Sequence, residues 1–396
     1  MLRQVEGSKA VADAVAACKP EVICAYPISP QTHIVEGLSQ LVKTGTLQHC
    51  EFINVESEFA AMSVAIGASA TGARTYTATA SQGLLFMVEA MYNASGLGLP
   101  IVMTVANRAI GGPINIWNDH SDSMSQRDSG WLQLYAENNQ EAADLHIQAY
   151  RIAEEMSIPV MVCMDGFILT HAYEQVDIPT AEEVSEFLPS FKPRQVLDPM
   201  DPVSIGAMVG PESFTEVKYL AHQRMIDSIA KIEEVADDFE KQFGRKTGGL
   251  LRTYRTEGAE TIVLALGSVI GTLKDVVDEL DLDGYSIGLV GLTSFRPFPF
   301  DAVRMALLGA KRVIILEKAF STGTGGIVTQ DVARAIEGLG LENLTLIAGL
   351  GGRPITIASL RRYLIDAMDD QVERLTFLDL ETETVTRELV KERALQ

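Results

Sequence analysis

Short apolar runs that alternate with helical patterns constrain the fold of this chain more than any other feature of its sequence. Runs rich in β-branched residues predict strands, and segments rich in Ala, Leu and Met between them predict helices. In the first part of the chain, strands are expected at residues 22–26, 52–55, 74–80, 100–106 and 159–164, and helices at 57–69, 84–95 and 141–156. Apolar strands that alternate with helices are typical of parallel sheets covered on both faces, so the sequence predicts an α/β fold.

The alternation stops after residue 178 and resumes near residue 261. Prolines crowd residues 189–211, which favours an extended connector at about residues 179–224. Apolar residues at helical spacing from Met225 to Phe239 predict an amphipathic helix after it. Further strands are expected at 261–268, 286–290, 312–317 and 345–348. We therefore predict two α/β domains with parallel sheets: residues 1–246, which include the connector and the amphipathic helix, and residues 247–396.

The charge and the apolar runs limit the classes of partner. The chain has 32 Lys and Arg against 53 Asp and Glu, a formal net charge of −21, so contact with nucleic-acid phosphates is not expected. Its apolar stretches are much shorter than the ~20 residues that span a bilayer, and its N-terminus lacks the pattern of a signal peptide. The cysteines form no C-x-x-C pair, and we expect buried thiols in a cytoplasmic protein without membrane contact. These are Cys18, Cys24, Cys50 and Cys163.

Three glycine patterns are weak candidates for nucleotide binding. Residues 67–72 have the spacing of a P-loop, but Ala73 and Arg74 stand where Lys and Ser or Thr are needed. The runs at 323–326 and 349–352 lack the third glycine of a dinucleotide fingerprint. We interpret all three as glycine turns.

Glu58 and the loop at residues 26–32 are the first candidates for chemistry. Glu58 lies at the predicted start of a helix, where it could be a half-buried functional acid. On spacing alone, the simpler interpretation is favoured, namely that Glu56 and Glu58 only complement the helix dipole. The loop carries two prolines at the carboxyl end of a strand, where open α/β sheets bind ligands. It could equally be a plain turn in which Ser29 or Thr32 caps the next helix.

Polar residues also follow two further strands of the predicted sheet. Ser81, Gln82 and Gly83 come directly after one strand, and Arg108 follows the next. A lone arginine is more often an ion-pair partner than a ligand-binding group. Residues 115–128 form a polar run that could line a site, although His120 alone is no metal signature.

Taken together, these loops resemble those of one family. The order of the motifs is similar to that in alpha subunits of multi-subunit pyruvate:ferredoxin oxidoreductases, which are 2-oxoacid:acceptor oxidoreductases that depend on thiamine diphosphate. The resemblance covers nearly the whole chain, with a pyrimidine-binding domain of the thiamine-diphosphate type followed by a domain like the transketolase C-terminal domain. The motifs are 25–30 (AYPISP), 56–58 (ESE), 79–83 (TASQG), 107–109 (NRA) and 118–122 (NDHSD).

The resemblance implies a role for individual residues. Glu58 corresponds to the acid that hydrogen-bonds the aminopyrimidine of thiamine diphosphate and assists its deprotonation. Ser29 and Arg108 correspond to residues that contact the carboxylate and carbonyl of the substrate. The cofactor pocket would be lined by Ile28, Ser81 and Gln82. No metal ligand is implied on this chain. The family usually has threonine in place of Ser29.

The motifs that are missing imply partner chains. The sequence contains no Gly-Asp-Gly motif for the diphosphate and Mg²⁺, and no cysteine pattern for an iron–sulfur cluster. In the resembling family, the Mg²⁺ site and the [4Fe-4S] clusters lie on beta, gamma and delta subunits, so this chain would hold half of a shared active site.

The activity implied is oxidative decarboxylation of a 2-oxoacid, with pyruvate as the first candidate, to acyl-CoA and CO₂. Coenzyme A would be a co-substrate and ferredoxin the electron acceptor. An alternative within the family is another 2-oxoacid, such as phenylglyoxylate or a branched-chain acid, and NAD is then an alternative final acceptor. An alternative of another class is a scaffold subunit without catalytic residues.

Overall fold

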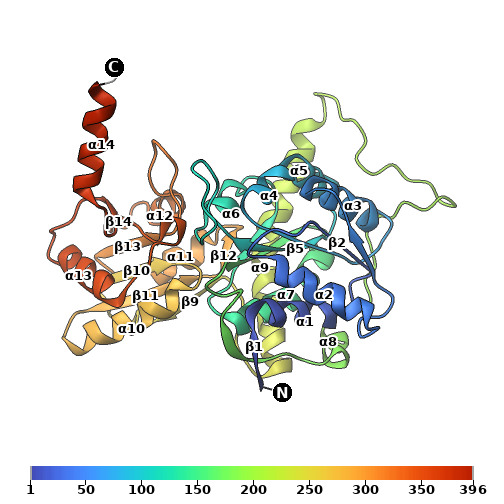
Figure 1. The fold of residues 1–396 in the computed structure, drawn as a ribbon, viewed down its shortest axis with the longest axis horizontal. Helices are drawn as coiled ribbons and strands as arrows, with labels where there is room; N and C mark the ends of the chain where they lie inside the picture. Colours follow the sequence, from blue (N-terminus) through green and yellow to red (C-terminus); the bar gives the residue numbers. More distant parts are fainter. Residues whose placement is uncertain (1, 395–396) are drawn as a thin grey trace.

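The computed structural model describes residues 2–394 and contains two large sheets with helices packed against them (Figure 1). In the view of Figure 1, the sheet of the N-terminal part lies on the right and the sheet of the C-terminal part lies on the left. A separate antiparallel pair is formed by β1 (Leu2–Glu6) and β8 (Tyr173–Asp177).

The first sheet has seven strands. They are β2 (Val22–Ala25), β3 (Glu51–Asn54), β4 (Thr75–Thr79), β5 (Val102–Asn107), β6 (Leu132–Tyr135), β7 (Val160–Asp165) and β12 (Ser294–Arg296). The order across the sheet is β12-β6-β7-β5-β4-β2-β3, and every neighbouring pair is parallel except β12 with β6. The helices of this part are α1 (Gly7–Ala17), α2 (Thr32–Lys43), α3 (Glu58–Ala70), α4 (Ser81–Phe86), α5 (Val88–Leu97), α6 (Ser121–Ser125), α7 (Asn139–Met156), α8 (Ala181–Phe187) and α9 (Phe214–Phe243).

The second sheet has six strands. They are β9 (Leu251–Tyr254), β10 (Thr261–Ala265), β11 (Ile287–Leu292), β13 (Arg312–Glu317), β14 (Glu342–Ile347) and β15 (Leu375–Phe377). The order is β15-β14-β13-β10-β11-β9, and only β9 runs antiparallel to its neighbour. The helices are α10 (Val269–Leu282), α11 (Phe300–Ala306), α12 (Val328–Ala335), the 3₁₀ turn η1 (Leu350–Gly352), α13 (Ile357–Met368) and α14 (Thr382–Ala394).

The predicted α/β class with parallel sheets is confirmed. Strands β4, β5, β7 and β10 are buried along their whole length, as expected for central strands covered by helices on both faces. Our division into residues 1–246 and 247–396 remains a proposal. Strand β12 lies beyond that boundary and yet pairs with β6, so the C-terminal part of the chain completes the edge of the first sheet.

The predicted extended connector at residues 179–224 is wrong at both ends. Residues 181–187 form α8, which begins with a capping box in which the backbone N–H of Glu183 donates to Thr180 Oγ1 (3.3 Å) and that of Thr180 donates to Glu183 Oε2 (2.8 Å). At the other end, α9 begins at Phe214 rather than near residue 225. The extended segment is therefore limited to residues 188–213.

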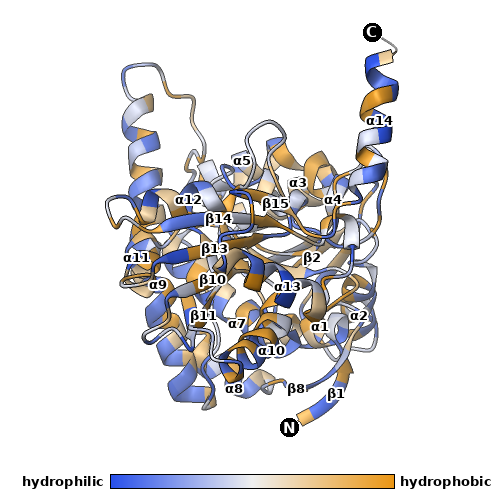
Figure 2. Ribbon diagram, turned by 90° about the vertical axis from the view of Figure 1, so that its left-hand side faces the viewer, coloured by the Kyte–Doolittle hydropathy of each residue, from blue (hydrophilic) through white to orange (hydrophobic). Residues whose placement is uncertain are grey.

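The central strands of the second sheet are mostly apolar, as Figure 2 shows for β10 and β13. Three of the four cysteines are buried as predicted, whereas Cys50 is half-buried, and all four are free thiols. Across residues 2–394, every helix is too short or too polar to cross a bilayer. Helix α14 projects from the C-terminal part in both overall views and buries none of its residues (Figures 1 and 2).

Candidate active site

Four neighbouring strands of the first sheet end at the same edge and place the candidate residues there. Strands β2, β4, β5 and β7 are parallel, so the loops that follow them leave the sheet on one side. These loops carry Ser29, Ser81, Arg108 and Gly166. The carboxyl edge of a parallel sheet is the usual position of ligand sites in open α/β folds.

Glu58 is a buried carboxylate in the first turn of α3. Ser57 caps this helix by accepting a hydrogen bond from the N–H of Ala60 at 3.2 Å. The side chain of Glu58 is only 7% exposed, and within residues 2–394 no hydrogen bond or ion pair reaches its carboxylate. Glu56, in contrast, is exposed. A largely buried carboxylate that accepts no hydrogen bond from the described residues is open to a ligand, so Glu58 is a candidate functional acid.

Gly83 lets α4 approach the carboxylate of Glu58. A Cβ atom added to Gly83 would lie 2.6 Å from Glu58 Oε1 and 2.5 Å from Thr79 Oγ1, which is closer than real Cβ atoms come to other heavy atoms. The hydroxyl of Thr79 is buried and has no hydrogen-bond partner in the described part of the chain. A carboxylate and a hydroxyl, both without partners, therefore lie beside a residue that carries no side chain.

Arg108 lies across the loop from Ser29 and has no carboxylate partner among residues 2–394. Its Nη1 donates to the backbone oxygen of Ser29 at 2.9 Å, and its Nε donates to the backbone oxygen of Asn115 at 3.2 Å. Burial lowers the pKa of Arg108, although the nearby Asp122 acts in the opposite direction. No acidic side chain among the described residues lies within salt-bridge distance of the guanidinium, so its charge is available to an anionic ligand.

The structure brings Ser29 and Ile28 to the same loop but does not fix their side chains. Ser29 is exposed and Ile28 is half-buried. The backbone N–H of Ile28 donates to Gln31 Oε1 at 3.3 Å, and Gln31 Nε2 donates to the backbone oxygen of Ala78 at 2.7 Å. Gln31 is fully buried, and it ties the loop to strand β4. Sequence reasoning did not single out this residue.

Ser81 begins α4 with a left-handed backbone, with φ of 50°. Such a conformation costs free energy in residues other than glycine and is found preferentially at functional sites. The Ser81 hydroxyl lies within hydrogen-bonding distance of the backbone oxygen of Ala109 and of Gln82 Oε1. A Cβ atom added to Gly111 would lie 2.1 Å from Gln82 Nε2, so the side chain of Gln82 packs directly against Gly111. Ser81 and Gln82 therefore contact the loop that carries Arg108.

Asp122 joins these loops, although the sequence analysis assigned it no role of its own. One carboxylate oxygen accepts the backbone N–H groups of Ser81 (2.9 Å) and Arg108 (3.0 Å), and the other accepts Asn107 Nδ2 (2.8 Å). The side chain is fully buried, and burial raises its pKa to about 6 despite these donors. Asp122 thus positions the backbone on both sides of the candidate site.

A second buried acid ties this edge to the C-terminal part of the chain. Asp165 accepts hydrogen bonds from Lys318 Nζ at 2.8 Å and from the backbone N–H of Ser268 at 3.1 Å, and it lies 2.6 Å from His120 Nε2. Burial raises the pKa of Asp165, but Lys318 and then His120 outweigh burial and hold the pKa well below its usual value. Lys318 Nζ also donates to Asn118 Oδ1. Lys318 follows strand β13 of the second sheet, so it anchors the polar loop at 115–128 to the C-terminal part of the chain.

Large apolar side chains are exposed beside these loops. Phe59 follows Glu58 directly, and its ring lies 6.4 Å from that of Phe86. The loop after Arg108 exposes Ile114 and Trp117. Exposed apolar residues gathered beside a site are typical of surfaces that another protein covers.

Comparison with known proteins places the chain among 2-oxoacid oxidoreductases. Residues 13–237 match the thiamine-diphosphate-binding domain of pyruvate flavodoxin/ferredoxin oxidoreductases, and residues 259–360 match core domain II of pyruvate:ferredoxin oxidoreductase. The chain is 47% identical to the pyruvate synthase subunit PorA of Methanosarcina barkeri over 96% of each chain. It is 39% identical to the ketoisovalerate oxidoreductase subunit VorA of Pyrococcus horikoshii, over 91% of this chain and 92% of that one.

The fold is also found in a solved structure. A 2-oxoglutarate:ferredoxin oxidoreductase from Magnetococcus marinus aligns with a TM-score of 0.69 over 92% of this chain and 65% of its own, at 18% identity. At that level of identity, the alignment establishes a common fold.

Proposed function

The chain belongs to the pyruvate flavodoxin/ferredoxin oxidoreductase family, and we propose that it is the alpha subunit of a CoA-acylating 2-oxoacid:ferredoxin oxidoreductase with pyruvate as its substrate. Family membership rests on both matched domains and on the 47% identity with a pyruvate synthase subunit. The ketoisovalerate relative favours a branched-chain 2-oxoacid as the second candidate substrate.

The observation that carries the proposal is the buried carboxylate of Glu58, which has no partner in residues 2–394. Beside it lie the unpartnered hydroxyl of Thr79 and the bare Cα of Gly83. A planar ring with a hydrogen-bonding nitrogen fits such a cradle, because the ring can approach the backbone of Gly83 and its nitrogen can share a proton with the Glu58 carboxyl group. These residues therefore suit the aminopyrimidine of thiamine diphosphate.

When bound, thiamine diphosphate supplies the nucleophilic carbon and the electron sink that decarboxylation of a 2-oxoacid requires. The role of Glu58 is to hold a proton at its Oε atoms and to share it with a ring nitrogen in a site from which water is largely excluded. Ile28, Ser81 and Gln82 line the same pocket in this proposal.

Arg108 is proposed to bind the carboxylate of the 2-oxoacid. A guanidinium presents donors in a planar fork that matches a carboxylate, and Arg108 forms no salt bridge within the described part of the chain. Because Arg108 Nη1 donates to the backbone oxygen of Ser29, the two residues lie side by side at this edge of the sheet. We propose that Ser29 contacts the carbonyl or side chain of the substrate.

The active site is proposed to be completed by partner subunits. This chain has no Gly-Asp-Gly motif and no cluster-binding cysteine pattern, so we assign the diphosphate, Mg²⁺ and the [4Fe-4S] clusters to beta, gamma and delta-type subunits. Exposed Phe59, Phe86 and Trp117 beside the site offer an apolar surface for such a partner. CoA is the proposed co-substrate and ferredoxin the proposed acceptor.

The experiment is to compare the purified chain with the complex co-expressed from the same organism. We expect the isolated chain to be colourless, to bind thiamine diphosphate weakly and to reduce no viologen dye with pyruvate and CoA. The complex should absorb in the visible range and turn over. A coloured, active preparation of this chain alone would contradict the proposal of a shared site.

A further inference from the structure

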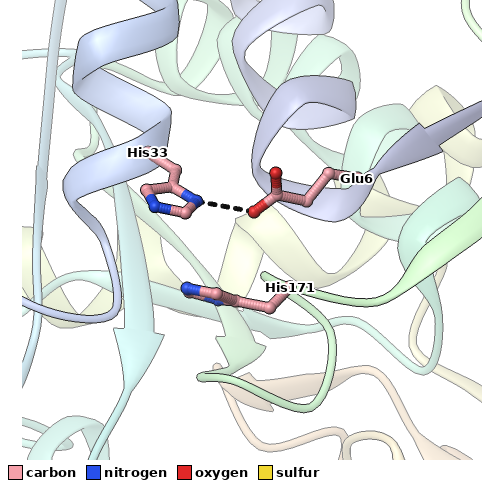
Figure 3. A group of neighbouring side chains, drawn as sticks. All are labelled: Glu6, His33 and His171. Carbon is pink, nitrogen blue, oxygen red and sulfur yellow. Dashed lines mark hydrogen bonds and ion pairs between the residues drawn. The ribbon is translucent and has the colours of Figure 1, made fainter.

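Glu6, His33 and His171 lie together outside the candidate active site. Glu6 ends strand β1, His33 is the second residue of α2, and His171 lies in the turn between β7 and β8. Figure 3 shows the carboxylate of Glu6 facing the ring of His33, with the ring of His171 beside both. These elements are far apart in sequence, so tertiary structure alone brings the three side chains together.

The distances are those of potential ligands for one metal ion. One donor atom from each side chain lies within 4.8 Å of the other two. Glu6 Oε1 and His33 Nδ1 are 2.7 Å apart, and the two imidazole rings have centroids 4.7 Å apart. Glu6 and His171 are half-buried, whereas His33 is exposed, so an ion can enter from solvent.

We propose that Glu6, His33 and His171 form a binding site for a divalent transition-metal ion of the zinc type. Two imidazole nitrogens and one carboxylate are a common ligand set for zinc, and water or another group then takes the fourth position. Mg²⁺ and Ca²⁺ prefer sets of oxygen ligands, so the two histidines select against them.

The surroundings of His171 support this assignment. Its Nδ1 lies 2.7 Å from Thr170 Oγ1, and that hydroxyl also accepts the N–H of Phe167 at 2.8 Å. Metal-binding histidines commonly hold the second ring nitrogen in such a hydrogen bond, which fixes the orientation of the ring.

The position of the site indicates what the ion does. His33 lies four residues after Ser29, and a Cβ atom on Gly166 would lie 2.5 Å from Pro30 Cγ. The turn that carries His171 therefore packs against the loop that carries Ser29. An ion held by Glu6, His33 and His171 would join β1, α2 and this turn, and so stabilise the outer side of that loop.

The test uses the full chain without a polyhistidine tag, after treatment with a chelator. Zn²⁺ is titrated in competition with a chromophoric chelator, and Co²⁺ is titrated by visible absorption. We expect one ion per chain. Removing a group that only hydrogen-bonds a metal ligand typically weakens metal binding by about 10- to 100-fold. Replacing one of the three ligands should therefore weaken binding by more than that.

Single substitutions test whether these three side chains bind the ion. Glu6→Gln, His33→Gln and His171→Gln should each show the loss, and His222→Gln, which changes an exposed histidine on α9, should not. Metal should also raise the melting temperature of the wild-type chain but not that of the variants. Binding that is absent in wild type, or equal in wild type and in all three folded variants, would overturn the proposal. If one variant fails to fold, the other two decide.

Discussion

Replacing Glu58 with glutamine should remove most of the activity of the complex while leaving the fold intact. Glutamine has nearly the same shape, and the carboxylate of Glu58 has no hydrogen bond or ion pair in residues 2–394 that the change could break. The change therefore removes no packing and no intramolecular hydrogen bond, so the melting temperature should change little. Loss of acid–base assistance typically costs about two to four orders of magnitude in rate, which corresponds to about 3–5 kcal/mol of activation free energy.

The assay is CoA-dependent reduction of a viologen dye by the purified complex, with pyruvate at saturation. Glu56→Gln is the matched control, because Glu56 is exposed and lies two residues away in the same ESE segment. It removes the same charge and should change kcat less than about tenfold. Circular dichroism and size-exclusion chromatography should give the same result for both variants and for wild type.

Two results would refute this reasoning. If Glu58→Gln keeps full activity, the carboxylate does no chemistry, and the alternative of an acid that only complements the dipole of α3 would stand. If Glu56→Gln is inactive and Glu58→Gln is not, we have assigned the acid to the wrong residue. In the first case, full activity of Glu56→Gln as well would favour a scaffold subunit.

Three further predictions concern the neighbouring loops. Arg108→Lys loses the planar fork and should lower kcat/KM for every 2-oxoacid tested by roughly 10- to 150-fold, the equivalent of about 1.5–3 kcal/mol. Ser29→Thr adds one methyl and should lower kcat/KM for 2-oxobutyrate and larger acids by about 10- to 200-fold more than for pyruvate, whereas equal losses would exclude a role in selectivity. Asp122→Asn should abolish a pH dependence of stability. Burial raises the pKa of Asp122 in the folded chain to about 6, above the pKa of an aspartate in the unfolded chain. The protonated side chain therefore stabilises the fold at low pH, and this contribution is lost as the pH rises through 6. In denaturant unfolding, wild type should therefore lose about 2 kcal/mol relative to the variant between pH 4 and pH 7, and parallel pH profiles would contradict the prediction.

The sequence predicted the central strands because their signal is local. Strands β5 and β7 are runs of apolar residues and lie within two residues of where they were expected. Strands β6, β12 and β15 have only three or four residues each and were not predicted, since so short a run has no clear period. The helix expected at 84–95 is divided at Met87 into α4 and α5.

The site was less predictable, because long-range hydrogen bonds assemble it. The sequence placed Ser29, Ser81 and Arg108 directly after three strands, and these strands are neighbours in the first sheet. Because the strands are parallel, the three residues lie at the same edge of the sheet. It could not indicate that Asp122 bonds the backbone of both Ser81 and Arg108, because the acid lies far from Ser81 in sequence. The sequence allowed a half-buried Glu58, but it could not indicate that Gly83 packs against its carboxylate.

The most direct test of the proposed function is a substrate panel on the purified complex. Pyruvate, a branched-chain 2-oxoacid and phenylglyoxylate are each supplied with CoA and ferredoxin, and acyl-CoA and CO₂ are measured together. We predict the highest kcat/KM for pyruvate, with acyl-CoA and CO₂ formed in equal amounts and no turnover without CoA. Negligible turnover of pyruvate beside fast turnover of either other acid would contradict the assignment of pyruvate, and no turnover of any 2-oxoacid would contradict the proposed function itself.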